Sequence, residues 1–167
     1  MRLVSRPTRD QWALQLAQVT AQRATCLRRQ VGCVLLNARG HVLATGYNGV
    51  AAGQPHCNEQ DPIAIETFGI ITPEELYPHA CTGATAPSGQ RLDDCQAIHA
   101  EQNALLQCGD VHQLHTCYVT VAPCITCAKL LLNTSCQRIV FVEEYPHAEA
   151  ERLWKRAGRA WLKAGTY

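Results

Sequence analysis

Apolar residues recur along the chain at two periods, and these periods predict a set of helices and strands. Spacings of three and four residues predict helices at about 8–24, 98–108, 123–133 and 148–157. Short runs rich in β-branched residues predict strands at 31–36, 41–47, 117–121 and 138–142, with a short last strand at 160–163. The order is a helix, a hairpin and then alternating helices and strands, which predicts a single-domain α/β sandwich with a mixed sheet.

Cap and turn residues support these boundaries. Thr8 stands where a helix N-cap is expected, and Gly109 and Gly158 follow two predicted helices. The four residues 37–40 join the first two strands and contain Asn and Gly, as hairpin connections do. We therefore expect the first two strands to pair antiparallel.

Residues from about 50 to 95 differ from the rest of the chain. They contain Gly, Pro, Thr, Ser and scattered Cys and His, with a weak helical pattern only near 73–77. A segment this long without periodicity is usually functional, or is held by something other than an apolar core. We expect one domain over residues 1–167 that carries this segment as a long irregular insertion.

Composition excludes several classes of protein. A chain with 47% hydrophobic and 17% charged residues is not disordered. The net charge of +1 lacks the basic excess expected of a protein that binds nucleic-acid polymers, and it favours association with other subunits. Apolar runs are too short for a membrane span and the N-terminus has no apolar signal segment, so we expect a cytoplasmic protein without a membrane partner.

Ten cysteines in 167 residues are the most unusual feature of the composition. In a short secreted protein they would indicate disulfides, but this chain is longer and has no signal segment. Metal binding or catalysis is therefore the better interpretation.

Two short motifs, each at the start of a predicted helix, carry the candidate chemistry. Cys124 and Cys127 are three residues apart, so they share one helix face, and the positive end of the helix dipole favours their thiolate forms. With His99 they form a His/Cys/Cys set, which suits Zn²⁺ and leaves a fourth position for water. Zinc lowers the pKa of that water toward 7. Glu101, two residues after His99, is placed to act as a proton shuttle.

Together the motifs match H-x-E followed by P-C-x-x-C, the signature of zinc deaminases that act on cytosine or adenine. Each half is a weak signal alone, because C-x-x-C also occurs in redox and structural sites. Both halves together, separated by one strand, favour a catalytic zinc, since a purely structural zinc would leave Glu101 without a role.

Longer segments resemble the deoxycytidylate (dCMP) deaminases over residues 10 to 158. The similar segments are Cys26–Cys33 (CLRRQVGC), Gly46–Gly49 (GYNG), His99–Ala104 (HAEQNA), Tyr118–Thr120 (YVT) and Pro123–Lys129 (PCITCAK). The resemblance implies a three-layer α/β/α sandwich with a mixed five-stranded sheet, and a homo-oligomer, typically a hexamer. It also implies hydrolysis of dCMP to dUMP for thymidylate synthesis, with activation by dCTP accompanied by Mg²⁺ and inhibition by dTTP.

The resemblance assigns the zinc ligands and the proton shuttle to the residues named above, and it adds four candidates for nucleotide contacts. Asn48 would lie near the substrate or effector, where its amide can donate and accept hydrogen bonds, although Asn-Gly is also a common turn. Tyr145 would contact the pyrimidine or close the site, unless it is a surface aromatic. Arg28 and Arg29 would meet the phosphate, unless they are solvated charges at a helix–strand junction.

The chain departs from the regulated relatives at the end of the helix predicted at 98–108. Those relatives carry an aromatic and a basic residue that are tied to the effector response, whereas this chain has Gln107 and Asp110. An acidic side chain near a triphosphate is unfavourable, which argues against control by dCTP or dTTP. The helix end Leu106–Cys108 is instead similar to that of bacterial competence-operon relatives.

A second, structural zinc is implied by several relatives, which place cysteines just before the first strand and after the GYNG segment. The candidate ligands here are Cys26, Cys57, Cys81 and Cys95. For the fourth ligand, Cys81 is chosen over His79 and His56. Such a site would hold the insertion, which has little apolar patterning; the alternative is free thiols. The remaining cysteines are predicted to be small buried residues: Cys33, Cys108, Cys117 and Cys136.

The leading interpretation is a zinc-dependent dCMP deaminase. Two alternatives stay open: deamination of another target, such as cytidine, a modified dCMP or a tRNA adenosine, and a catalytically silent module that senses nucleotides. A tRNA-acting enzyme would need more basic surface than a net charge of +1 provides. The presence of Glu101 argues against a silent module.

Overall fold

The computed structural model describes residues 5–60, 72–87, 90–146 and 148–165. In chain order its elements are α1 Arg9–Ala21, β1 Gly32–Asn37, β2 Val42–Tyr47, α3 Pro73–Leu76, a 3-10 turn Leu92–Asp94, α4 Ala100–Gln107, β3 Leu114–Val121, α5 Ile125–Leu132, β4 Arg138–Glu143, α6 Glu149–Arg156 and β5 Ala160–Lys163. The strands form one sheet in the order β2-β1-β3-β4-β5. β1 is antiparallel to β2 and β3, whereas β4 is parallel to β3 and β5. No described helix is both long and apolar enough to cross a bilayer.

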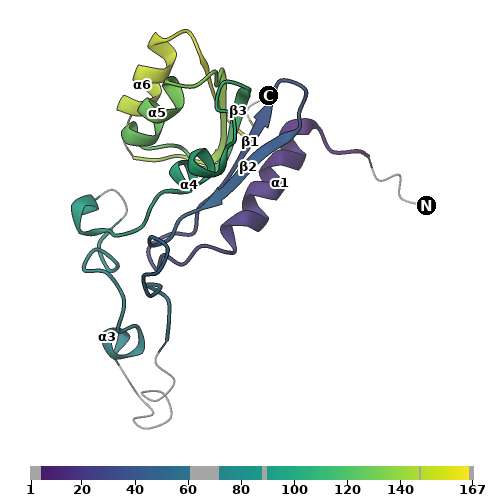
Figure 1. Cartoon of the computed structure of the whole chain (residues 1–167). Coiled ribbons are helices and arrows are strands. Elements are labelled where there is room, and N and C mark those ends of the chain that lie inside the picture. The colour runs from purple at the N-terminus through teal and green to yellow at the C-terminus, as the bar shows by residue number, and fades with distance from the viewer. Residues whose placement is uncertain (1–4, 61–71, 88–89, 147, 166–167) are drawn as a thin grey trace.

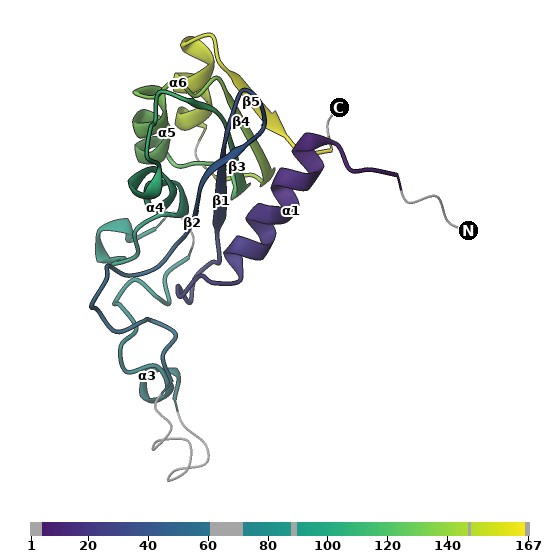
Figure 2. The same ribbon diagram turned by 45° about the vertical axis from the view of Figure 1, so that its right-hand side comes forward.

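Helices cover both faces of this sheet (Figures 1 and 2). α1 packs on one face, and α4, α5 and α6 pack on the other. β1 lies in the middle layer, so its alternate side chains are buried in opposite directions. Leu35 belongs to the core cluster under α4 and α6, and Val34 belongs to the cluster under α1. The predicted three-layer α/β/α sandwich with a mixed five-stranded sheet is confirmed.

The local boundary signals are confirmed with two differences. Thr8 caps α1, because its hydroxyl accepts a hydrogen bond from the Gln11 amide at 3.2 Å. Gly158 follows α6 with φ of 72°. Gly109 does not end α4, since the chain is already extended at Cys108. β3 begins at residue 114 rather than 117, because its first residues pair with the end of β1.

The insertion between β2 and α4 extends away from one end of the sheet (Figures 1 and 2). An isolated antiparallel β-bridge pairs Gly49 with Ile98, so the two ends of the insertion lie side by side. Its described part has only a small buried cluster of Cys57, Cys81 and Ala84. The weak helical pattern is confirmed as α3, and residues 61–71 and 88–89 lie outside the described residues.

Candidate active site

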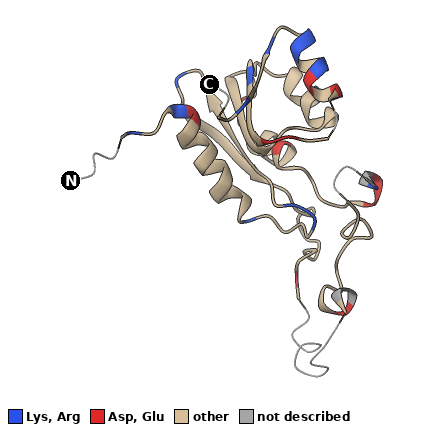
Figure 3. Cartoon of the chain, turned by 180° about the vertical axis from the view of Figure 1, so that it is seen from behind, with Lys and Arg blue, Asp and Glu red and all other residues tan. Residues whose placement is uncertain are grey.

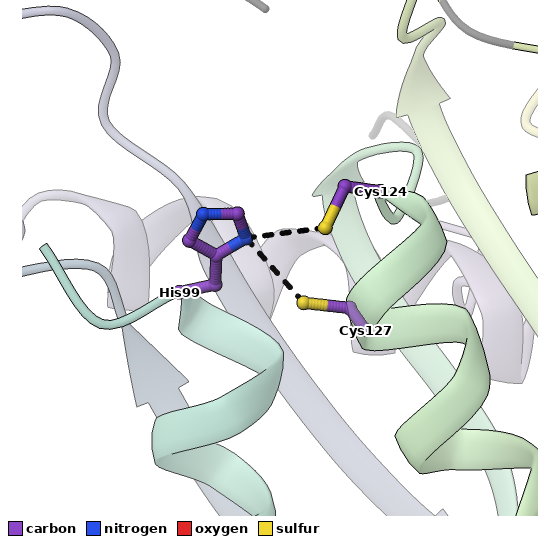
Figure 4. Close-up of side chains that lie close together, drawn as sticks. All are labelled: His99, Cys124 and Cys127. Carbon is purple, nitrogen blue, oxygen red and sulfur yellow. Dashed lines mark hydrogen bonds between the residues drawn. The ribbon is translucent and has the colours of Figure 1, made fainter. Parts of the chain in front are cut away.

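The two sequence motifs meet at the first turns of α4 and α5 (Figure 4). His99 is the N-cap of α4 and Cys124 is the N-cap of α5, which directly follows β3. The Nδ1 atom of His99 lies 3.5 Å from Sγ of Cys124 and 3.4 Å from Sγ of Cys127. Within the described ranges, this is the one group of three potential metal ligands whose atoms lie within 4.8 Å of one another.

Local backbone contacts orient this ligand set. The Gln102 side chain accepts a hydrogen bond from the His99 amide at 2.8 Å, which holds the first turn of α4. On α5, the Ala128 amide donates to the Cys124 carbonyl at 2.9 Å and starts the helix there. Both ligand-bearing residues are therefore fixed by helix initiation rather than by a flexible loop.

The three ligand atoms fit a zinc ion. A nitrogen about 2.1 Å and a sulfur about 2.3 Å from one tetrahedral centre would lie about 3.6 Å apart. The two nitrogen–sulfur distances of 3.5 and 3.4 Å agree with this spacing. One imidazole and two thiolates also form a donor set that zinc prefers in proteins. The residues present could therefore hold Zn²⁺.

Hydrogen bonding within the cluster favours a thiolate at Cys124. A hydrogen bond from the Cys127 thiol, together with one from His99, lowers the pKa of Cys124 to about 4. The pKa of Cys127 is raised, mainly because its thiol donates this hydrogen bond to Cys124 and secondly because the thiol is buried. The hydrogen bond to Cys124 raises the pKa of His99. A ready thiolate at a helix N-terminus is the form that binds metal.

Glu101 lies on the first turn of α4 and is only 4% exposed. Burial raises the pKa of its carboxyl to about 7, because the charged form loses its water. A carboxyl with this pKa can accept and release a proton near neutral pH. Glu101 also lines the same cleft as His99 and Cys124, so the carboxyl and two of the three candidate ligands face one space.

The cleft brings together all four residues predicted to contact a nucleotide, which are Arg28, Arg29, Asn48 and Tyr145. These residues are far apart in the sequence, and they come from the segments before β1, after β2 and after β4. Sequence analysis missed the apolar part of the wall, formed by Val31, Ala97, Ala100, Val121 and Ala122. The only available signal was their position beside the motifs, because small apolar residues there look like ordinary core.

Asn48 is buried and its amide is bonded to the backbone before β1. Its Oδ1 accepts from the Val31 amide and its Nδ2 donates to the Arg29 carbonyl, each at 2.7 Å. Asn48 is therefore more than the turn residue that Asn-Gly alone would suggest. It joins the end of β2 to the segment that carries both arginines.

The four cysteines predicted to hold a second metal gather at the base of the insertion. Cys57 and Cys81 are buried in one cluster, and Cys95 packs against it. Burial alone would raise the pKa of the Cys81 thiol, but hydrogen bonds from the Gln96 backbone and the Cys57 thiol lower it. Cys26 and Cys95 also line the cleft that contains His99 and Glu101. Because Cys95 belongs to the insertion, the insertion forms part of the cleft wall.

The fold and the His/Cys/Cys set are also found in a known family of zinc-binding proteins. Residues 7–143 match the family described as the cytidine and deoxycytidylate deaminase zinc-binding region. This chain belongs to that family, which confirms the resemblance seen in its motifs.

Individual relatives point to the same family. The deoxycytidylate deaminase of Mycobacterium phage D29 is 35% identical over 142 residues, which cover 84% of this chain and 99% of the phage protein. That of Schizosaccharomyces pombe is 33% identical over 142 residues, and this chain spans only 38% of its length. The crystal structure of the cyanophage S-TIM5 dCMP deaminase in complex with dCMP and dUMP has a TM-score of 0.67 at 20% identity, over 95% of this chain and 98% of that chain. This likeness shows a shared fold.

Proposed function

We propose that this chain is a zinc-dependent deaminase that hydrolyses dCMP to dUMP and ammonia, and so supplies dUMP for thymidylate synthesis. The observation that carries the proposal is the meeting of a His/Cys/Cys set with a buried carboxyl in one cleft. The phage D29 relative supports it, because this deoxycytidylate deaminase matches the chain over almost its whole length.

Each residue of the site has a task in this reaction. Zinc would be held by three protein ligands, which are His99, Cys124 and Cys127. Zinc usually has four ligands, so one position is not taken by the protein. When bound, zinc supplies a Lewis acid that lowers the pKa of a coordinated water toward 7. Glu101 takes one proton from the attacking water and delivers it to the ring nitrogen as the carbon–oxygen bond forms. It then takes the remaining proton of that oxygen and delivers it to the amine, which leaves as ammonia when the carbon–nitrogen bond breaks. The water oxygen becomes the new carbonyl oxygen of dUMP.

The remaining cleft residues would contact the nucleotide. Arg28, Arg29, Asn48 and Tyr145 line the cleft beside the ligand set. Regulation by dTTP, or by dCTP with Mg²⁺, stays a prediction. Gln107 and Asp110 are both exposed at the end of α4, and a titration of the reaction rate with dCTP tests whether these residues allow control.

A structural zinc at Cys26, Cys57, Cys81 and Cys95 is a second part of the proposal. Three of these side chains are buried, and Cys81 is hydrogen-bonded to Cys57 and Cys95. His79 and His56 are exposed, which favours Cys81 as the fourth ligand. The four sulfur atoms are less closely grouped than the catalytic set. Two zinc ions per chain, measured by elemental analysis, would support this site, and one would refute it.

Assembly and location also remain predictions. A homo-oligomer, with a hexamer as the expected form, follows from the family resemblance and is measured by light scattering. The cytoplasmic location rests on the sequence, since a chain with ten thiols suits a reducing compartment.

The experiment that tests the function is a substrate panel with the purified chain. Deamination of dCMP, deoxycytidine, cytidine and tRNA is followed by ultraviolet absorbance or, for tRNA, by inosine content. We expect turnover of dCMP, and its loss in Glu101→Gln with zinc retained. Turnover of cytidine or tRNA without turnover of dCMP would reject the substrate, and full activity in Glu101→Gln would reject the mechanism.

A further inference from the structure

The helix α4, which follows His99 and carries Glu101, lies directly against the edge strand β2. Gly46 of β2 has no side chain, so the backbone of α4 approaches this strand closely. Such a contact sets the distance between helix and strand, but it offers no interlocking side chains that would resist rotation of the helix. Ion pairs form on α6, whereas Glu101 is the one charged residue of α4 (Figure 3). The rotation of α4 must therefore be fixed by uncharged groups.

One side chain of α4 is hydrogen-bonded to the sheet. Nδ2 of the half-buried Asn103 donates to the carbonyl oxygen of Tyr47, the last residue of β2, at 2.8 Å. Among the described residues, no other side chain of α4 is hydrogen-bonded to a strand. Because a short amide joins the helix to a fixed backbone oxygen, this bond opposes rotation of α4 about its own axis.

The same end of β2 also holds the chain just before His99. Ile98 and Gly49 exchange two backbone hydrogen bonds, at 2.8 and 3.2 Å. Inside the helix, the Asn103 amide nitrogen donates to the His99 carbonyl at 2.9 Å. His99 and Glu101 therefore lie between two attachments to the end of β2, one at the preceding residue and one at Asn103.

These attachments matter because the two halves of the site reach it in different ways. The helix α5, with both cysteines at its start, directly follows β3, whereas α4 follows the long insertion. Nδ1 of His99 nevertheless lies within 3.5 Å of both sulfur atoms. A metal site requires its ligands to be held within about 0.5 Å of the correct geometry. Chain connectivity holds α5 in place, and α4 depends on its contacts with β2.

We propose that Asn103 is a positioning residue, whose hydrogen bond to the Tyr47 carbonyl fixes the rotation of α4 and so aligns His99 and Glu101 with the cysteines of α5. The amide acts as a donor in this bond, so the N–H group is the part of Asn103 that the site needs. Asn103 neither belongs to the ligand set nor lines the cleft. The effect on catalysis rests on the proposed function, whereas the effect on metal binding does not.

Replacement of asparagine by aspartate, which has nearly the same shape, tests the donor. A carboxylate has no N–H group, so Asn103→Asp loses the bond and places a negative charge beside the Tyr47 carbonyl oxygen. Asn37→Asp is the matched control, at the end of β1 that lies away from the cleft. There Oδ1 of the half-buried Asn37 accepts from the His41 amide at 2.9 Å, and a carboxylate can still accept.

Circular dichroism and thermal melting first establish that each variant is folded at the assay temperature. The metal-free chains are then titrated with Co²⁺, and the thiolate–cobalt absorption that Cys127→Ser lacks identifies the signal of the His/Cys/Cys site. Competition with a chelator gives the affinity for Zn²⁺. We expect Asn103→Asp to bind metal at this site about 10- to 100-fold more weakly, the range for groups that orient metal ligands. In the zinc-loaded chain, kcat for dCMP should fall by a similar factor, with a smaller change in KM. Asn37→Asp should match the wild-type chain in every measurement.

Two more variants keep the test decisive. Asn103→Gln retains the amide donor on a side chain that is one carbon longer, and it should lose less metal affinity than Asn103→Asp. Asn103→Ala removes the donor without adding a charge, and it replaces Asn103→Asp if that variant does not fold.

The positioning role is rejected if the folded donor-free variant keeps the wild-type metal affinity, if Asn103→Gln loses as much as that variant, or if Asn37→Asp loses as much. A lower melting temperature with unchanged metal affinity and kcat would mean that Asn103 only stabilises the fold, which also rejects the role. If metal affinity falls as expected but the wild-type chain does not deaminate dCMP, the proposed function fails and the positioning role of Asn103 stands.

Discussion

Gly46→Ala should displace the helix that carries His99 and Glu101. A Cβ atom at residue 46 would lie 2.2 Å from the Ala100 carbonyl oxygen and 2.4 Å from the Ala104 amide nitrogen. Both are backbone atoms of α4, so no side-chain rotation can relieve the contact. Ordinary contact begins near 3.4 Å, and α4 would therefore have to move away from β2 by about 1 Å.

This movement has two consequences. Overpacking of this kind lowers the free energy of unfolding by about 1–3 kcal/mol, and contacts with helix backbone place Gly46→Ala at the upper end. A shift of about 1 Å also separates His99 and Glu101 from the cysteines of α5, and misplacement by this amount costs about 100-fold in rate. We expect lower zinc content and a fall in kcat/KM for dCMP of at least that size.

Gly109→Ala is the matched control, because it lies just beyond the same helix and a Cβ atom there meets nothing within 4 Å. It should be neutral or stabilising by about 0.4–1 kcal/mol. Urea denaturation, zinc analysis and initial rates are measured on both variants. If Gly46→Ala matches Gly109→Ala in all three, the close approach of α4 to β2 does not position the site.

Three further predictions concern the metal and the core. Cys127→Ser should lose one zinc ion per chain and the activity, whereas Cys136→Ser, equally buried, should keep both; elemental analysis and rates decide. Removal of zinc with a chelator should abolish deamination and lower the melting temperature, because metal binding stabilises only the folded chain, and added Zn²⁺ should restore both. Tyr118→Phe removes the hydroxyl that donates to Asp10 at 2.6 Å; it should lower the free energy of unfolding by about 1–2 kcal/mol in urea and leave kcat unchanged, because this pair lies under α1.

Each of these predictions has a result that would contradict it. Zinc retained in Cys127→Ser, or lost equally in Cys136→Ser, would remove Cys127 from the ligand set. Activity in a metal-free chain would exclude zinc from the reaction. A change of kcat in Tyr118→Phe would mean that the α1 face of the sheet is coupled to the cleft.

The sequence alone predicted the elements and the candidate metal ligands, because both depend on short-range spacing. Alternation and three- to four-residue periods placed the strands and helices to within a few residues. Two cysteines three positions apart at a helix start must share a face, whatever the rest of the fold does. The family resemblance followed from the same short segments.

Only the tertiary structure decided how distant segments meet. The strand order, with β4 parallel to both neighbours, brings the first turns of α4 and α5 together. Arg28 and Arg29 are adjacent and chemically alike in the sequence. Yet Arg28 binds the insertion, whereas Arg29 has a buried donor with no acceptor among the described residues. No local pattern could separate them, because the partner of Arg28 lies 62 positions away and that of Arg29 lies about 114 positions away. Which distant residue reaches each arginine depends on how the whole chain packs.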